Sequence, residues 1–319
     1  MTKKTIFESM RTFCFLLAVI FAFSANAQVN TLVSIPNRSL IELADGHQLH
    51  RFEFDVCGSL EGRKVDVWLP KNVEKNTRLA VIYAHDGQNL FDPSSAYGGQ
   101  SWLLHQAAQR LIDSGKIKPV MIVGIWNSPQ RFSEYLPAPA VATLSPALLE
   151  QLSKERGSKP QSDAYLAWLS LELKPYLDGL FPTLGEPENT MIMGSSMGGL
   201  ISSYALAKYP FIFGGAACLS THWPISLSTN DTAFSGPYRR YLSKNLPRSG
   251  SHKLWMDYGT ATLDAWYEPH QLAFNKALLK QNGWRLHQNF MSKKYADAPH
   301  NEVAWRARSG EVLRFLLAP

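Results

Sequence analysis

Residues 193–199, which read MGSSMGG, have the composition of a turn that presents a nucleophilic serine. They contain the pattern Gly-x-Ser-x-Gly with Ser196 at its centre, whereas the spacing of Ser195 to the flanking glycines does not fit. The pattern alone is weak, but here it follows an apolar run at 190–193 and precedes an apolar run at 197–208. A nucleophile elbow requires this order of strand, tight turn and helix. We therefore predict that Ser196 is a nucleophile.

A serine hydroxyl needs a general base to become nucleophilic, and the base needs an acid that orients it. In chains with this elbow, the acid and the histidine follow the serine in that order. Among the later histidines, His300 follows the last predicted strand, at 285–291, and precedes the final predicted helix, which favours it as the base. His287 falls inside that predicted strand. His222 follows the end of an earlier strand, and we predict that it lines the substrate pocket.

The orienting acid is expected after the penultimate predicted strand, at 253–258. Asp264 lies in the segment beyond that strand, where a carboxylate can reach the histidine, and Asp257 lies nearer the strand itself. We favour Asp264 and keep Asp257 as the alternative. Asp264 could also cap a helix that starts nearby, whether or not it takes part in chemistry.

A tetrahedral oxyanion needs hydrogen-bond donors that are already in place. The first predicted donor is the backbone N–H of Met197, directly after the nucleophile, at the positive end of the predicted helix. The second should come from residues 85–92, HDGQNLFD, which follow the buried run at 79–84. We predict the backbone N–H of Gln88, with that of Gly87 as the alternative. The same loop could be only a tight turn capped by Asp86.

Buried strands alternate with helices along the chain. The predicted strands are 64–69, 79–84, 120–125, 190–193, 215–219, 253–258 and 285–291, and the predicted helices are 101–113, 163–180, 196–208, 264–281 and 303–317. Pro175 argues against an unbroken helix at 163–180. This order predicts an α/β fold with a mostly parallel sheet, helices on both faces and an antiparallel edge. The proline-rich stretch 138–161 is predicted to be an insertion, either a pocket wall or lid or a solvated loop.

The N-terminus has the order of a secretory signal peptide. Three basic residues precede an apolar run at 13–23, and Ala25-Asn26-Ala27 follows it. We expect cleavage after residue 27, one domain at 28–319, export to the periplasm or medium, and no stable membrane insertion afterwards. Cys57 and Cys218 then remain. Export permits a bridge between them, but free buried thiols are the favoured interpretation.

Composition argues against several other classes of protein. The formal net charge is +6, but the basic residues are scattered and form no track for nucleic acid. Neither a P-loop nor a G-x-G-x-x-G pattern occurs in the sequence, so no cofactor is expected. His47 and His50 have metal-ligand spacing, but they lack further cysteine or acidic ligands at suitable positions. We therefore expect no metal site.

Three of these segments together resemble the putative-esterase family. They are the run at 85–92, the elbow at 194–199 and the late His-Asn-Glu at 300–302. The family includes enterochelin esterases, feruloyl and acetyl xylan esterase domains, S-formylglutathione hydrolases and mycolyltransferases. The resemblance covers roughly residues 50–317 and implies an α/β-hydrolase fold.

By this resemblance, the catalytic triad and the oxyanion donors fall on the residues already singled out. They are Ser196, Asp264 and His300 for the triad, and Met197 and Gln88 for the oxyanion. Residues 124–127 with Arg131, Glu134 and Tyr135 are similar to a family loop beside the site. In some members the acid stands three residues after the glycine that matches Gly259. Here that position is Thr262, so the loop must be longer.

The expected reaction is hydrolysis of a carboxylic ester through an acyl-serine intermediate. The expected substrate is a small-molecule or polysaccharide-linked ester, contacted by Trp126, His222 and Trp223. An acyltransferase would use the same three residues. The alternative outside enzymes is an exported protein that binds carbohydrate or siderophore on the same scaffold without catalysis.

Overall fold

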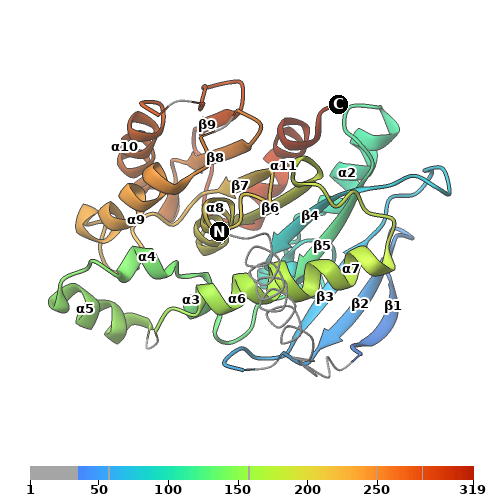
Figure 1. The fold of residues 1–319 in the computed structure, drawn as a ribbon, viewed down its shortest axis with the longest axis horizontal. Helices are drawn as coiled ribbons and strands as arrows, with labels where there is room; N and C mark the ends of the chain where they lie inside the picture. Colours follow the sequence, from blue (N-terminus) through green and yellow to red (C-terminus); the bar gives the residue numbers. More distant parts are fainter. Residues whose placement is uncertain (1–34, 57, 157–158, 249, 282) are drawn as a thin grey trace, which may run out of the picture. The chain divides into compact units, whose positions relative to one another are not determined.

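A mixed sheet organises the part of the chain that the computed structural model describes, which is residues 35–319 except 57, 157, 158, 249 and 282 (Figure 1). Pro36–Pro319 group into one unit by their contacts. In these described residues, no helix has both the length and the apolar character that a membrane span requires. The predicted signal peptide, residues 1–27, lies outside the described residues.

The sheet has nine strands in the described residues, in the order β1-β2-β3-β5-β4-β6-β7-β8-β9. Their bounds are β1 Asn37–Glu42, β2 Gln48–Phe54, β3 Arg63–Trp68, β4 Ala80–His85, β5 Val120–Ile125, β6 Thr190–Ser195, β7 Gly215–Leu219, β8 Lys253–Gly259 and β9 Phe290–Tyr295. The pairs β1–β2, β2–β3 and β3–β5 are antiparallel, and all later pairs are parallel. The predicted mostly parallel sheet with an antiparallel edge is confirmed.

Helices cover both faces of the sheet, as predicted. One face carries α2 (Leu104–Asp113) and α11 (Glu302–Leu317), which lie side by side in Figure 1. The other face carries α3 Arg131–Tyr135, α4 Ala138–Val141, α5 Pro146–Arg156, α6 Ser162–Trp168, α7 Lys174–Leu180, α8 Met197–Lys208, α9 Thr232–Asn245 and α10 Glu268–Leu278. Each layer encloses its own apolar core against the sheet.

The continuous apolar runs arise because the central strands are buried on both faces. In β4, Val81 and Tyr83 pack into one core, while Ala80, Ile82 and Ala84 pack into the other. A strand with two buried faces needs apolar residues at every position. Because these strands are parallel, their carboxyl ends meet at one edge, and the segments that follow them lie close together.

The predicted helix at 163–180 is interrupted just before Pro175, in agreement with the expected effect of this proline. The segment forms α6, a π-type turn η3 (Leu169–Leu173) and then α7, in which Pro175 occupies the first turn. Proline lacks the N–H of an ordinary helical residue and collides with the preceding turn. A wider turn accommodates this residue and keeps one apolar side, including Leu166, Leu173 and Leu177, against the sheet.

The secondary structure departs from the prediction in two places, and it adds detail to the predicted insertion. The stretch 138–161 contains α4, which packs on α9, and α5. Helix α9 itself was not predicted. The last strand starts at Phe290 rather than 285, so His287 lies in the preceding turn, where its φ is 62° and its N–H donates to the carbonyl of Phe290.

Cys218, in β7, has a buried thiol that forms no disulfide. The free-thiol interpretation is therefore confirmed for this residue, whereas Cys57 lies outside the described residues. Burial raises the pKa of the Cys218 thiol, so the thiol stays protonated and is a poor nucleophile.

The burial of His85 predicts a pH dependence of stability. His85 ends β4, its Nδ1 lies 2.8 Å from the Tyr165 hydroxyl, and burial lowers its pKa to about 3. An unfolded histidine titrates near 6.5, so the unfolded chain binds more protons between these values. Stability is therefore fully present above about pH 6.5 and is lost as the pH falls towards 3.

As the pH falls over this range, the free energy of unfolding should decrease less steeply for the His85→Gln variant than for the wild type. The two slopes should differ by about 1.4 kcal/mol per pH unit. Urea unfolding of the two proteins between about pH 7 and pH 4 measures the difference. His287→Gln, at an exposed position, controls for the substitution itself. Equal slopes for the wild type and His85→Gln would contradict the argument.

Candidate active site

Ser196 occupies a strained turn between β6 and α8. Its φ and ψ are 58° and −120°, and its N–H donates to the carbonyl of Leu219 at 2.9 Å. A Cβ at Gly194 would lie 2.9 Å from the backbone of Gly198, so this position must be glycine. A non-glycine residue with positive φ is held by its surroundings and often marks a functional site. The geometry is that of the predicted nucleophile elbow.

His300 and Asp264 are joined by a short hydrogen bond, with 2.5 Å between Nδ1 and Oδ1. Asp264 lies in the short 3₁₀ helix η5 (Thr262–Trp266) after β8, and His300 lies between β9 and α11. The backbone N–H of His300 donates to Oγ1 of Thr262 at 2.8 Å. Thr262, which occupies the position of the acid in some family members, therefore fixes the histidine loop.

The carboxylate of Asp264 is fully buried and depends on hydrogen bonds for its charge. Its Oδ2 accepts from the Ser220 hydroxyl at 2.6 Å and from the Gly259 N–H at 2.5 Å. Burial alone would raise the pKa of Asp264, but the bonds from His300, Ser220 and Gly259 hold it below its usual value. The carboxylate is thus ionised and oriented toward the imidazole.

Asp257, the alternative acid, has a different set of partners. It lies within β8, is fully buried, and pairs with Arg308 Nη2 at 2.8 Å. It also accepts hydrogen bonds from the Trp255 indole at 2.7 Å and from the Ser220 N–H at 3.0 Å. Burial raises its pKa, although Arg308 opposes the shift. This geometry favours Asp264 as the group that orients His300.

Ser220 connects the two buried carboxylates. Its hydroxyl accepts hydrogen bonds from Arg308 Nη2 at 2.6 Å and from the Trp305 indole at 2.9 Å, and it donates to Asp264. Ser220 directly follows β7, and Arg308 and Trp305 lie on α11. The position of Asp264 therefore depends on the end of β7 and on α11, which are distant from each other in the sequence.

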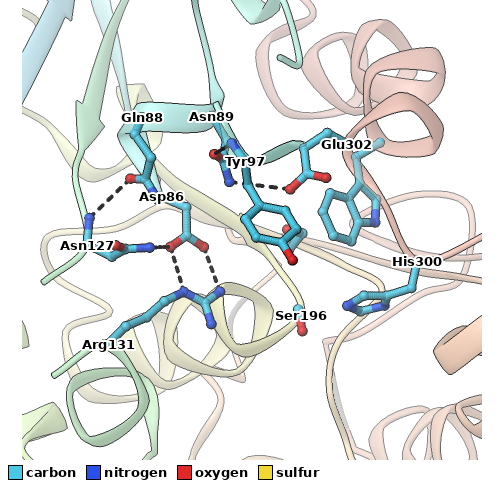
Figure 2. Close-up of a pocket in the computed structure, with 11 residues that line it drawn as sticks. Asp86, Gln88, Asn89, Tyr97, Asn127, Arg131, Ser196, His300 and Glu302 are labelled. Carbon is cyan, nitrogen blue, oxygen red and sulfur yellow. Dashed lines mark hydrogen bonds and ion pairs between the residues drawn. The ribbon is translucent and has the colours of Figure 1, made fainter. Parts of the chain in front are cut away.

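Ser196 and His300 line the same pocket, which has a volume of about 320 Å³. Figure 2 shows the imidazole of His300 pointing toward Ser196. The Tyr267 hydroxyl is in hydrogen-bonding contact with Ser196 and lies 2.9 Å from Nδ1 of His222. Burial raises the pKa of Tyr267 well above its usual value, so its hydroxyl is neutral.

An ion pair between the buried Asp86 and the half-buried Arg131 holds the loop after β4. The Arg131 guanidinium donates two hydrogen bonds of 2.7 Å to the Asp86 carboxylate, which also accepts from Asn127 Nδ2 at 2.7 Å. Burial would raise the pKa of Asp86, but Arg131 keeps it below its usual value. Gln88 follows in the short 3₁₀ helix η1 (Gly87–Asn89), and its side chain accepts from the Asn127 N–H at 3.3 Å.

Gln88 lines the pocket, and Met197 begins α8 directly after the nucleophile. A helix cannot satisfy the N–H groups of its own first turn. Among the described residues, neither the backbone N–H of Gln88 nor that of Met197 has a hydrogen-bond acceptor. The structure thus leaves both predicted oxyanion donors free.

The three predicted substrate contacts do not line this pocket. Trp223 is buried in the core, where its indole N–H donates to Gln271 at 2.9 Å. His222 is also buried, and its Nδ1 lies 2.9 Å from the Tyr267 hydroxyl. Trp126 lines a neighbouring pocket of about 400 Å³ and donates to Asp66 at 2.7 Å. Asn127 lines both pockets.

Sequence reasoning missed several groups in and behind the pocket. Arg131 was placed only in a family-like loop beside the site and Asp86 only as a possible turn cap, and their ion pair was not predicted. Tyr97 and Glu302 also line the pocket. Glu302 was named only as part of the family-like motif at 300–302, and no sequence pattern singled out Tyr97. Ser220 and Arg308 could not be paired from their spacing in the chain.

No arrangement in the described residues suits a metal ion, since none brings three or more His, Cys, Asp or Glu residues together in a suitable geometry. The two histidines with metal-ligand spacing have other partners. His47 Nδ1 accepts from the Trp68 indole at 3.1 Å, and His50 Nδ1 lies 3.0 Å from Arg38.

The chain belongs to the putative esterase family, whose sequence pattern matches residues 60–311. The fold is similar to that of an IroE-like serine hydrolase from Shewanella oneidensis, with a TM-score of 0.62 and 20% identity over 83% of this chain and 79% of that one. It is also similar to the enterobactin esterase FES of Shigella flexneri, with a TM-score of 0.60 and 15% identity over 88% of this chain and 61% of that one.

A further sequence relative is the uncharacterized protein YbbA of Bacillus subtilis strain 168. It is 26% identical over 163 residues, which is 50% of this chain and 58% of that protein. The match therefore spans little more than half the length of this relative. The structural similarities show an α/β-hydrolase fold, and together with the family they support an esterase or hydrolase function.

The buried pair of Asp257 and Arg308 gives a prediction about stability. Arg308→Met should lower the free energy of unfolding by about 3–5 kcal/mol, because it leaves a buried carboxylate without its cation. The double variant Arg308→Met/Asp257→Asn should recover part of this loss, because the remaining group is then neutral. Urea unfolding measures both. A double variant no more stable than the single one would contradict the explanation.

Proposed function

We propose that the protein is a serine carboxylesterase that uses Ser196, His300 and Asp264. The observation that carries this proposal is the buried Asp264 carboxylate bonded to Nδ1 of His300, in the same pocket as an elbow serine. The bond requires a hydrogen on Nδ1, which leaves Nε2 of the neutral imidazole as the acceptor. That nitrogen is the one able to take the serine proton.

In the proposed mechanism, the Ser196 hydroxyl oxygen attacks the ester carbonyl while His300 takes its proton. The tetrahedral intermediate then collapses, the alcohol leaves with the proton from His300, and the acyl group stays on the serine. Water attacks the acyl-serine by the same sequence and releases the acid. Asp264 keeps the imidazole in one tautomer and stabilises its charged form.

The free N–H groups of Gln88 and Met197 are the proposed oxyanion donors. Gln88 is held by the loop that Asp86 and Arg131 fix, and Met197 by the first turn of α8. The positive end of the helix also favours negative charge beside Ser196. Donors fixed before the reaction need no rearrangement when charge develops, which makes them effective.

The activity can be tested without knowing the substrate. A fluorophosphonate should add once to the purified protein, and intact mass should show the adduct absent from Ser196→Ala. The neighbouring Ser195→Ala variant should keep the adduct, because Ser195 is not at the elbow position. Thermal unfolding of each variant confirms that it is folded.

His300→Gln should slow the same labelling by about 100-fold or more, since a general base supplies about this factor. An adduct that persists on Ser196→Ala would refute Ser196 as the nucleophile. A folded wild-type protein that forms no adduct would refute the serine mechanism as a whole.

We also propose that the protein is exported and acts on an ester of a small molecule or a polysaccharide. The N-terminal pattern at 1–27 supports export. Fractionation of cells that express the full chain should recover a protein with the mass of residues 28–319 in the periplasm or medium. Recovery of the uncleaved chain in the cytoplasm would contradict this.

A further inference from the structure

Tyr97 is an exposed aromatic residue at the rim of the pocket. Its side chain is 80% exposed, yet it lines the same pocket as Ser196 and His300. Figure 2 shows the ring beside Asn89, with its hydroxyl end toward Ser196 and His300. An aromatic ring exposed to this extent offers a flat apolar surface that a ligand ring can cover.

The backbone around Tyr97 is held in place from the oxyanion loop. Asn89 Oδ1 accepts a hydrogen bond from the Tyr97 N–H at 2.9 Å. The ring is carried on the short 3₁₀ helix η2 (Tyr97–Gly99), in which Gly98 and Gly99 have φ values of 61° and 68°. The exposed ring therefore projects from a defined turn.

Glu302 lines the same rim and lacks a cationic partner. Asn89 Nδ2 donates to its Oε1 at 3.3 Å, and among the described residues no Lys, Arg or His lies within ion-pair distance. The other carboxylate in the pocket lining, Asp86, is already paired with Arg131. Glu302 therefore gives the lining one net negative charge when His300 is neutral. Burial, together with the charge of Asp86, raises the pKa of Glu302.

We propose that Tyr97 and Glu302, which are both hydrogen-bonded to Asn89, bind the part of the substrate that does not react. We propose that this part is an uncharged ring with hydroxyl groups. The ring stacks on Tyr97, and a hydroxyl donates a hydrogen bond to Glu302. A carboxylate accepts such bonds but repels an anionic group, and the repulsion is stronger in a pocket than in water. The inference rests on the proposed esterase function and adds the charge and shape of its substrate.

The test uses two esters with the same ring and one ester without a ring. They are 4-(hydroxymethyl)phenyl acetate, which is neutral and carries a hydroxyl, 4-acetoxybenzoate, which is anionic, and ethyl acetate. The wild type should hydrolyse the hydroxymethyl ester with a higher kcat/KM than the anionic ester. Glu302→Gln should reduce that preference about tenfold, because it removes the repulsion. Glu311→Gln, which removes an exposed charge from the same helix, should leave the preference unchanged.

Tyr97→Ala should lower kcat/KM about three- to tenfold for both ring esters, mainly through KM. The same variant should lower kcat/KM for ethyl acetate by a smaller factor, because this ester has no ring to stack on Tyr97. Tyr97→Phe keeps the flat ring and should restore the wild-type values. A structural defect would instead slow all three esters alike.

Fluorophosphonate labelling separates failure of this inference from failure of the proposed function. Without labelling at Ser196, the esterase proposal itself fails. A labelled protein that does not distinguish the two ring esters, including one that hydrolyses neither, would overturn the inference. An unchanged preference in Glu302→Gln, or an equal loss on all three esters in Tyr97→Ala, would also overturn it.

Discussion

The buried carboxylate of Asp264 is the constraint on which the candidate site depends. An ionised carboxylate inside a protein is strongly destabilising unless hydrogen bonds replace its water. Here they come from His300, Ser220 and the Gly259 N–H, which belong to three different segments. The requirement to satisfy one side chain thus brings the ends of β7, β8 and β9 together. The same requirement orients the imidazole toward Ser196.

The central strands could be predicted because burial on both faces leaves a continuous apolar run. The run at 120–125 coincides with β5, and the elbow followed from glycine positions that its backbone demands. Strand β9, FMSKKY, is mostly half-buried at the sheet edge, so it lacks such a run and was placed too early. Helix α9 contains Pro237, and a proline at this position argues against a helix when only the sequence is known.

Residues whose role depends on distant partners could not be placed in this way. Asp86 and Arg131 are 45 residues apart, and Ser220 and Arg308 are 88 residues apart, so sequence spacing does not reveal either contact. The same holds for Trp223, because its indole N–H donates to Gln271, 48 residues away, in the core. The nucleophile could thus be identified from the glycines that its turn requires. The groups that surround it could be identified only from the folded structure.

The carboxylates around the site are of two kinds. Most are paired with an arginine and stabilise the fold, whereas Glu302 has no such partner and lines the pocket. Asp86 pairs with Arg131, Asp257 with Arg308, and Glu134 with Arg63. A carboxylate buried without a partner destabilises a protein, so these pairs satisfy their carboxylates. They link β8 to α11, β3 to α3, and the loop after β4 to α3. Glu302 is only half-buried, and water can solvate it while the pocket is open. A bound ligand would displace that water, so the ligand itself must supply the missing hydrogen-bond donor.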